Sequence, residues 1–243
     1  MPGPEPTALY AAAGALAAGG LLATGLAGVF HPRSTLFGPT IWRGTSTRTA
    51  VAVTFDDGPD PRYTARIARI LDAHQARATF FCIGQKLEQH RSFATALQAS
   101  GHELENHTYR HGTGRDLFST SRLREDLQRC QELLITLSGR VPRYYRPAVG
   151  IRNPHVHAAA RSLGLTVVTW TLAARDGVIG LTPRRALRLA DRADAGSILA
   201  LHDGQLHGGP SLREQTVEQL PQLLLRLKER GFIFQTLAEL LEG

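Results

Sequence analysis

Adjacent carboxylates at Asp56 and Asp57 close an apolar run and are followed by Gly58 and Pro59. Successive side chains of a strand point to opposite faces, but a turn at Gly58 can bring both carboxylates toward one centre. One could then bind a cation while the other serves as a base. The alternative interpretation is an Asx turn at the end of a strand.

A second candidate group is the histidine pair His107 and His111. The i, i+4 spacing predicts both imidazoles on one face of a helical turn, which suits a divalent metal. Such a pair in a polar loop is often incidental. Joined to one carboxylate of the Asp56–Asp57 pair, however, it makes a set of two nitrogens and one oxygen. That set suits zinc or another late divalent ion and leaves positions open for water and substrate.

Three further segments end predicted strands. Arg146 follows a short tyrosine-rich run and could form a fork with a carboxylate, or be a surface arginine before a turn. His202 could be a general acid, because imidazole titrates near neutrality, and Asp176 could orient it. On its own, His202 would more often be a capped core histidine.

The elements that must position these residues alternate between apolar strands and amphipathic helices. Strands are predicted at residues 50–55, 78–83, 103–105, 165–170, 197–201 and 232–234. Helices are predicted at residues 62–74, 85–99, 119–137, 183–193 and 211–230, the last with a kink or a fresh start at Pro221. This order predicts a parallel α/β fold, such as a small or incomplete barrel, whose site lies just past the carboxyl ends of the strands.

Composition bounds the class of protein. The chain has 243 residues with 42% hydrophobic residues, which fits one domain and excludes a disordered or collagen-like chain. The net charge of +7 permits an anionic partner, but the arginines are spread along the chain, so no nucleic-acid partner is expected. Cys82 and Cys130 cannot make a disulfide scaffold, and buried free thiols are expected.

The N-terminal segment carries no charged residue from 6 to 32. Residues 7–30 are long enough to span a bilayer core of roughly 30 Å, and an uncleaved transmembrane anchor is expected over 1–30. A signal peptide is the competing interpretation, although residues 1–6 lack a positive charge, and an alanine-rich soluble helix is a third. Residues 31–49 then form a linker to a domain at 50–243. By the positive-inside rule, the arginines after the span favour a cytoplasmic domain. The charge bias is small, however, and the orientation stays open.

The motifs Thr-Phe-Asp-Asp-Gly-Pro, His-Thr-x-x-His, Arg-Pro-x-x-Gly, Asp after Trp and Leu-x-His occur in one order. Residues 50–241 therefore closely resemble the polysaccharide deacetylase family, also called the NodB homology domain or carbohydrate esterase family 4. The resemblance implies a distorted, incomplete (β/α) barrel and metal-dependent hydrolysis of an N-acetyl group on an amino sugar. It also implies a cell-surface or periplasmic domain.

The resemblance assigns a role to each motif. Asp57, His107 and His111 look like the metal ligands, with Zn²⁺ expected first and Co²⁺, Mn²⁺ or Ni²⁺ as alternatives. Asp56 looks like the general base for the attacking water, and His202 looks like the general acid.

The remaining roles concern the surroundings of these groups. Asp176 would stand behind the general acid, and Arg146 would belong to the groove wall, near enough to tune the catalytic carboxylates. The amide of Val149 would be the oxyanion donor. The substrate-contacting and supporting residues are expected to be Leu201 against the acetyl methyl, Trp170 beside the substrate, and Thr108 steadying the metal-binding loop.

Departures from the family pattern fall at four positions. Ala173 and Gly177 stand where Asp and Trp are common, and Ala148 and Val149 stand where Pro and Tyr are common. We interpret these as a changed acceptor site, so polysaccharide, peptidoglycan and glycolipid substrates all stay open. A deformylase, an O-deacetylase, another amide hydrolase and a non-catalytic membrane-anchored carbohydrate-binding protein are the alternatives.

Overall fold

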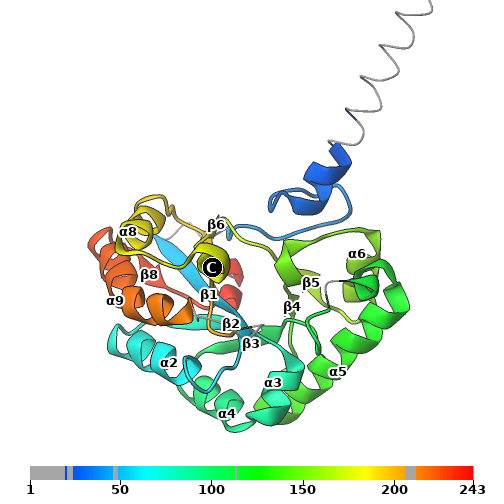
Figure 1. The fold of residues 1–243 in the computed structure, drawn as a ribbon, viewed down its shortest axis with the longest axis horizontal. Coiled ribbons are helices and arrows are strands. Elements are labelled where there is room, and N and C mark those ends of the chain that lie inside the picture. The colour runs from blue at the N-terminus through cyan, green and yellow to red at the C-terminus, as the bar shows by residue number, and fades with distance from the viewer. Residues whose placement is uncertain (1–19, 21–23, 46–48, 113, 206–211, 243) are drawn as a thin grey trace, which may run out of the picture.

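Parallel strands form one curled sheet whose outer side is ringed by helices (Figure 1). The computed structural model describes residue 20 and residues 24–45, 49–112, 114–205 and 212–242. Within these residues the eight-stranded sheet has the order β5-β4-β3-β2-β1-β7-β6, and β8 pairs with β1. The strands are β1 (Ala50–Gly58), β2 (Ala78–Cys82), β3 (Glu103–Asn106), β4 (Tyr144–Tyr145), β5 (Thr166–Val167), β6 (Leu172–Ala173), β7 (Ser197–His202) and β8 (Ile233–Phe234).

Helices follow most strands, which confirms the predicted parallel α/β alternation. They are α2 (Thr64–Ala73), α3 (Gly84–Gln89), α4 (Ser92–Ala99), α5 (Thr120–Ser138), α6 (Pro154–Ser162), α7 (Asp176–Ile179), α8 (Pro183–Asp191), α9 (Arg213–Glu229) and α10 (Leu237–Glu242). Two 3-10 turns, η1 (Arg115–Phe118) and η2 (Ala148–Gly150), complete the set.

Two predicted helices differ from those observed. The helix predicted at 85–99 is divided into α3 and α4. Pro221 was expected either to kink the last long helix or to begin a new one, and no new helix begins there, because α9 runs through it as one helix. Leu220, Leu223 and Leu224 are fully buried on both sides of this position, so packing outweighs the one hydrogen bond that proline cannot make.

The alternation of side chains along β1 decides which residues face the inside of the curled sheet. Val51, Val53 and Phe55 join the core beneath the outer helices. Ala50 and Ala52 join a separate core inside the curl, which α10 helps to close. Even-numbered residues of β1 therefore face the interior, and odd-numbered residues face the helices.

The segment expected to be a linker packs along the domain. The amide of Ile41 donates to the Val167 carbonyl at 3.0 Å, and the Thr169 amide donates to the Ile41 carbonyl at 2.8 Å. Arg43 forms an antiparallel bridge with Ser197 on β7. Residues 41–43 thus fill the gap between the two ends of the sheet.

A buried arginine fixes the preceding part of the same segment. The guanidinium of Arg152, which is 1% exposed, donates to the carbonyl oxygens of Val29, His31, Pro32 and Ser34 at 2.6 to 3.3 Å. The four carbonyls lie at the end of the helix at 24–30 and in the irregular segment that follows it, so one side chain supplies hydrogen bonds to much of this backbone.

The predicted membrane anchor lies mostly outside the described residues, which include only its last part, a helix at 24–30. In the described part of the chain, no helix is both long enough and apolar enough to cross a membrane. The predicted buried free thiols are confirmed at Cys82 and Cys130.

Candidate active site

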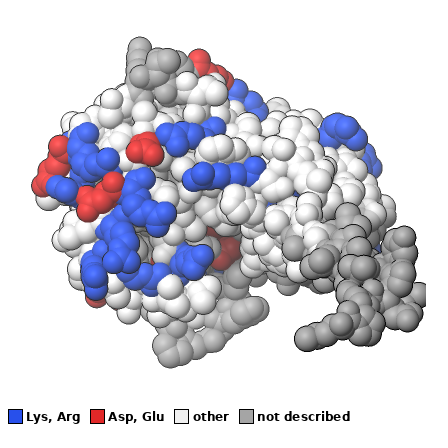
Figure 2. Space-filling model, turned by 90° about the horizontal axis from the view of Figure 1, so that it is seen from above, with Lys and Arg blue, Asp and Glu red and all other residues white. Residues whose placement is uncertain are grey.

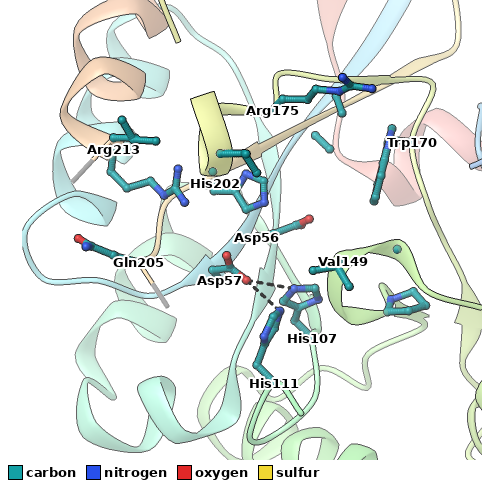
Figure 3. A pocket seen from close by; sticks show the side chains of 17 residues that line it. Asp56, Asp57, His107, His111, Val149, Trp170, Arg175, His202, Gln205 and Arg213 are labelled. Carbon is teal, nitrogen blue, oxygen red and sulfur yellow. Dashed lines mark ion pairs between the residues drawn. The ribbon is translucent and has the colours of Figure 1, made fainter. Parts of the chain in front are cut away.

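A cavity of about 490 Å³ opens at the carboxyl ends of β1 and β7 (Figure 3). Most of the residues singled out from the sequence line it together: Asp56, Asp57, His107, His111, Val149, Trp170 and His202. Thus five motifs far apart in the sequence meet in one hollow, as expected for side chains that follow parallel strands.

The two adjacent carboxylates reach the cavity by different means. Asp56 is an even-numbered residue of β1 and faces the interior by the regular alternation. Asp57 would face away in a regular strand, but the pairing with β2 shifts register between Asp56 and Gly58, and Asp57 has a φ of 71°. This irregularity turns the second carboxylate toward the same centre. The Lys86 ammonium donates to the Asp57 carbonyl oxygen at 2.6 Å and supports that conformation.

Asp57, His107 and His111 form a cluster whose ligand atoms all lie within 4.8 Å of one another. Asp57 Oδ1 lies 3.3 Å from His107 Nε2 and 3.2 Å from His111 Nε2 (Figure 3). His107 Nδ1 is 2.7 Å from the Arg146 carbonyl oxygen, so that nitrogen carries the proton and Nε2 keeps its lone pair. The donor set of two imidazoles and one carboxylate fits zinc or a similar divalent ion.

Burial and neighbouring charges favour the ligating protonation states. Burial raises the pKa of Asp57, but the neighbouring imidazoles, first that of His107, outweigh it and hold that pKa well below its usual range. Burial and the neighbouring His107 lower the pKa of His111 to about 4. A carboxylate and a neutral imidazole are the forms that bind a metal ion.

The predicted helical turn at His107 to His111 is wrong, because these residues form a loop after β3. Thr108 has a φ of 68° and His111 a φ of 55°, values that a right-handed helix does not contain. The His111 amide donates to Thr108 Oγ1 at 2.9 Å, and the Tyr109 amide donates to Asp126 Oδ2 at 2.9 Å. Side-chain acceptors thus hold the loop, and Thr108 steadies it as predicted.

Arg146 lies beneath the cavity, whereas the prediction placed it in the groove wall, but it does contact the Asp56 carboxylate, near which it was expected. The side chain is fully buried. Its Nη1 atom donates to Asp56 Oδ1 and to Thr54 Oγ1, both at 2.7 Å, and Nη2 donates to the Thr169 carbonyl at 2.9 Å. The guanidinium also packs over the Phe81 ring at 4.0 Å. The arginine therefore fixes one oxygen of the Asp56 carboxylate and leaves the other toward the cavity.

The partly exposed His202 pairs with the fully buried Asp176 beside the carboxylates. The register of β1 and β7 sets Asp56 directly opposite His202. His202 Nδ1 lies 2.7 Å from Asp176 Oδ1, and Asp176 Oδ2 accepts from the His202 amide and from Thr216 Oγ1. Burial alone would lower the pKa of His202, but the Asp176 carboxylate outweighs it and raises that pKa to about 9. The imidazole is therefore protonated at neutral pH, with Nε2–H free to act as a donor.

Of the predicted substrate-contacting residues, Val149 and Trp170 line the cavity and Leu201 does not. Val149, in η2, is 62% exposed and has a φ of 48°, and Trp170 packs over Gly150 on the neighbouring wall. Leu201 does not line the cavity: its side chain lies in the core beneath the helices, and Ala200 lines the cavity instead. The alternation along β7 is the reason, since His202 and Ala200 share the inner face.

Sequence reasoning missed several residues of this cavity. Arg175, Gln205 and Arg213 also line it. Asp203 lies behind it, fully buried, and burial raises its pKa to about 7. Arg175 and Asp203 sit next to predicted residues, and that adjacency was the available signal. Arg213 comes from α9, and only the folded chain brings it to the site.

The polysaccharide deacetylase family model matches residues 43–168 of the chain. The chain is 31% identical over 205 residues to a chitooligosaccharide deacetylase of Azorhizobium caulinodans, covering 80% of this chain and 96% of that protein. It is 31% identical over 210 residues to a peptidoglycan-N-acetylglucosamine deacetylase of Bacillus cereus, covering 84% and 93%. A solved CE4 family pseudoenzyme from Bacillus anthracis is similar with a TM-score of 0.73 and 25% identity, covering 83% of this chain and 68% of that one.

Proposed function

The chain belongs to the polysaccharide deacetylase family, and we propose that it is a metal-dependent hydrolase that removes N-acetyl groups from an amino-sugar-containing carbohydrate. The observation that carries this proposal is the meeting of three groups in one cavity. These are the Asp57, His107 and His111 cluster, the Asp56 carboxylate and the protonated His202 imidazole. Hydrolysis of an amide needs an electrophile, a base and an acid, and each group supplies one of them.

Asp57, His107 and His111 would hold the metal ion. A divalent ion there would act as a Lewis acid that polarises the acetyl carbonyl and the attacking water. Zinc fits the donor set best, and Co²⁺, Mn²⁺ and Ni²⁺ accept similar ligands.

The remaining steps belong to side chains and backbone of this chain. Asp56 accepts a proton from the attacking water, with Arg146 holding the carboxylate in place. The Val149 amide donates to the oxygen that becomes negative in the tetrahedral intermediate. His202 Nε2–H protonates the departing amine nitrogen, and Asp176 keeps the imidazole oriented and charged. General base and general acid each contribute about 10²–10⁴-fold.

Two alternatives use the same structure. A deformylase or an O-deacetylase would need the same acid, base and metal, and differs only in the acceptor. A non-catalytic carbohydrate-binding protein is suggested by the similarity to a pseudoenzyme. Against it, the proposed base, the proposed acid and the three proposed metal ligands all line one cavity of the described residues.

Acetate release tests the proposal. The zinc-loaded full chain would be given chito-oligosaccharides, peptidoglycan fragments and N-acetylated glycolipids, with formylated and O-acetylated acceptors beside them. Asp56→Asn removes the base and should abolish release, while Asp194→Asn changes an exposed carboxylate away from the cavity and should not. Release from no acceptor by a metal-loaded protein would contradict the proposal, and release of only formate or ester-derived acetate would favour the alternatives.

We also propose that the N-terminal segment anchors the protein and that the domain faces the cell surface or periplasm. The support is the uncharged run at 6–32 and the family resemblance. Protease treatment of intact spheroplasts should digest the domain, and protection until lysis would contradict this orientation.

A further inference from the structure

A second cavity, of about 880 Å³, adjoins the active-site cavity. Its walls are residues 30–33 of the N-terminal segment, residues 170–175 around β6, and helix α8 with Arg192. Trp170, Ala173 and Arg175 line both cavities. A molecule that enters the active site from this side therefore passes along the second cavity, which we call the basic groove.

The basic groove carries a single sign of charge. Among the described residues that line it are five arginines and no aspartate or glutamate: Arg33, Arg175, Arg185, Arg188 and Arg192. The last three are spaced by three and four residues, which places them on one face at and just beyond α8. In Figure 2, which shows the molecule from above, arginine and lysine side chains gather on the left half of the face, with a few acidic side chains among them.

No carboxylate of the described residues forms an ion pair with any of these five arginines. Within the same residues, the hydrogen bonds of the Arg185 guanidinium all go to neutral carbonyl oxygens, those of Ile179, Gly180 and Ala174 at 2.9, 2.6 and 3.5 Å. Arg188 and Arg192 have neither a hydrogen-bond nor an ion-pair partner for their side chains in the described part of the chain. The nearby acid, Asp191, is paired with Arg226 at 2.8 Å. Like charges held around one hollow repel each other, and a bound anion would relieve that repulsion.

The N-terminal wall of the basic groove is held in place. Arg152 donates to the carbonyl oxygens of His31 and Pro32, the two residues that precede Arg33. The Arg33 guanidinium lies over the Trp42 ring at 4.7 Å from its centroid. Because this wall is already held in place, an anion can bind without the entropic cost of ordering it.

We propose that the basic groove binds the phosphate or diphosphate group of an amino-sugar phosphate while the sugar's acetamido group occupies the active-site cavity. This inference rests on the proposed deacetylation and adds the acceptor class. Guanidinium groups match the oxygens of phosphate in a two-pronged fashion. The positive charge of five guanidiniums is also more than a single carboxylate, such as a peptide terminus, can balance. A diphosphate carries more than one negative charge and balances more of it. Ala173, on the wall shared by the two cavities, adds no charge that would repel such a group.

Two acceptors with the same sugar separate the basic groove from the active site. One joins N-acetylglucosamine through a diphosphate to a short prenyl chain, and the other is an uncharged prenyl glycoside of N-acetylglucosamine. Acetate release by the zinc-loaded full chain gives kcat/KM for each, and we expect at least tenfold preference for the diphosphate. N-acetylglucosamine 1-phosphate as a competitor distinguishes a contribution of the phosphate from one of the lipid.

The double variant Arg188→Glu/Arg192→Glu reverses two exposed charges that hold no partner, so folding should be kept. The ratio of the two kcat/KM values should fall tenfold to a hundredfold, mainly through KM of the diphosphate acceptor. Arg184→Glu is the matched control, because Arg184 is an exposed arginine of the same helix that does not line the basic groove. That variant should keep the wild-type ratio.

A binding measurement makes failure of this inference distinguishable from failure of the proposed function. Calorimetry gives the dissociation constant of N-acetylglucosamine 1-phosphate without any turnover. Weaker binding in the double variant but not in Arg184→Glu supports the basic groove even if no acetate is released. An unchanged kcat/KM ratio or an unchanged dissociation constant in the double variant would overturn the inference. So would a double variant that loses only its adsorption to phosphatidylglycerol vesicles, because the groove would then be a membrane contact.

Discussion

The fully buried guanidinium of Arg146 donates to Asp56 at 2.7 Å, while the carbonyl oxygen of the same residue lies 2.7 Å from His107 Nδ1. One residue therefore contacts both the proposed base and a proposed metal ligand. Its position after β4 is fixed by the strand pairing of β3 with β4. A shift of this short strand would move both contacts together.

Arg146→Met tests the energetic weight of the ion pair with Asp56. The variant leaves a buried carboxylate without its cation, so we expect the free energy of unfolding to fall by about 3–5 kcal/mol. Urea unfolding at saturating zinc measures it. In the Arg146→Met/Asp56→Asn double variant the buried charge is gone, and part of the loss should be recovered. A single variant within about 1 kcal/mol of wild type would contradict a structural role for this pair.

Metal binding should stabilise the protein through the Asp57 cluster. Zinc at a hundred times its dissociation constant should add about 2.7 kcal/mol to the free energy of unfolding, and a chelator should remove it together with acetate release. Asp57→Asn should lose this gain. His155→Ala removes an exposed histidine outside the cluster and should keep it. Equal zinc stabilisation in wild type and Asp57→Asn would show that the ion binds elsewhere.

Much of the site could be predicted from its motifs, but not the way some residues reach it. Asp57, Thr108, His111, Val149 and Arg175 all have positive φ values without being glycine. The sequence offers no signal for such conformations, because they cost energy locally and persist only when surrounding contacts enforce them. For that reason the His107 to His111 segment was predicted as a helical turn and is a loop.

The alternation along strands explains one success and one failure of prediction. His202 points into the cavity and Leu201 into the core because they are neighbours on β7.

The arginines of the basic groove, in contrast, could not be predicted to lie together. They are spread over the sequence from Arg33 to Arg192, and the fold brings together the Arg152-bound segment, residues 170–175 around β6, and α8 with Arg192.

The pH dependence of turnover should report the His202–Asp176 pair. The general acid must be protonated, and its pKa is raised to about 9, so kcat/KM should fall as pH rises through about 9. Because the raised pKa comes from the Asp176 charge, Asp176→Asn should move this decline to lower pH, toward the ordinary imidazole value of about 6.5. Thr216→Val removes a hydrogen bond to Asp176 but not its charge, so its decline should move less. If kcat/KM declined at the same pH in wild type, Asp176→Asn and Thr216→Val, His202 would be excluded as the general acid.

The same pair should make stability depend on pH. A folded pKa above the unfolded value means that folding stabilises protonated His202. Its contribution is complete below about pH 6.5 and is lost as pH rises through about 9. In Asp176→Asn the free energy of unfolding should change less between these two pH values than in wild type. An equal change in both proteins would contradict the assignment of the raised pKa to Asp176.

Val149 combines a β-branched side chain with a left-handed backbone, which costs about 1–2 kcal/mol. Val149→Gly removes this strain but adds about 0.5–1 kcal/mol of backbone entropy, so stability should rise by up to about 1 kcal/mol. Val141 is similarly exposed, 64% against 62%, and has no positive φ, so Val141→Gly should instead destabilise. Urea unfolding of both variants measures the contrast, and destabilisation in both would refute the strain.

The same position separates a backbone role from a side-chain role in catalysis. If the Val149 amide is the oxyanion donor, Val149→Gly keeps it and should lower kcat less than tenfold. Val149→Pro removes the N–H and forces φ to about −65°, so kcat should fall about 10²–10³-fold. A large loss of kcat in the stable glycine variant would assign the contact to the isopropyl group. Little loss in the proline variant would mean that oxyanion stabilisation does not need this amide.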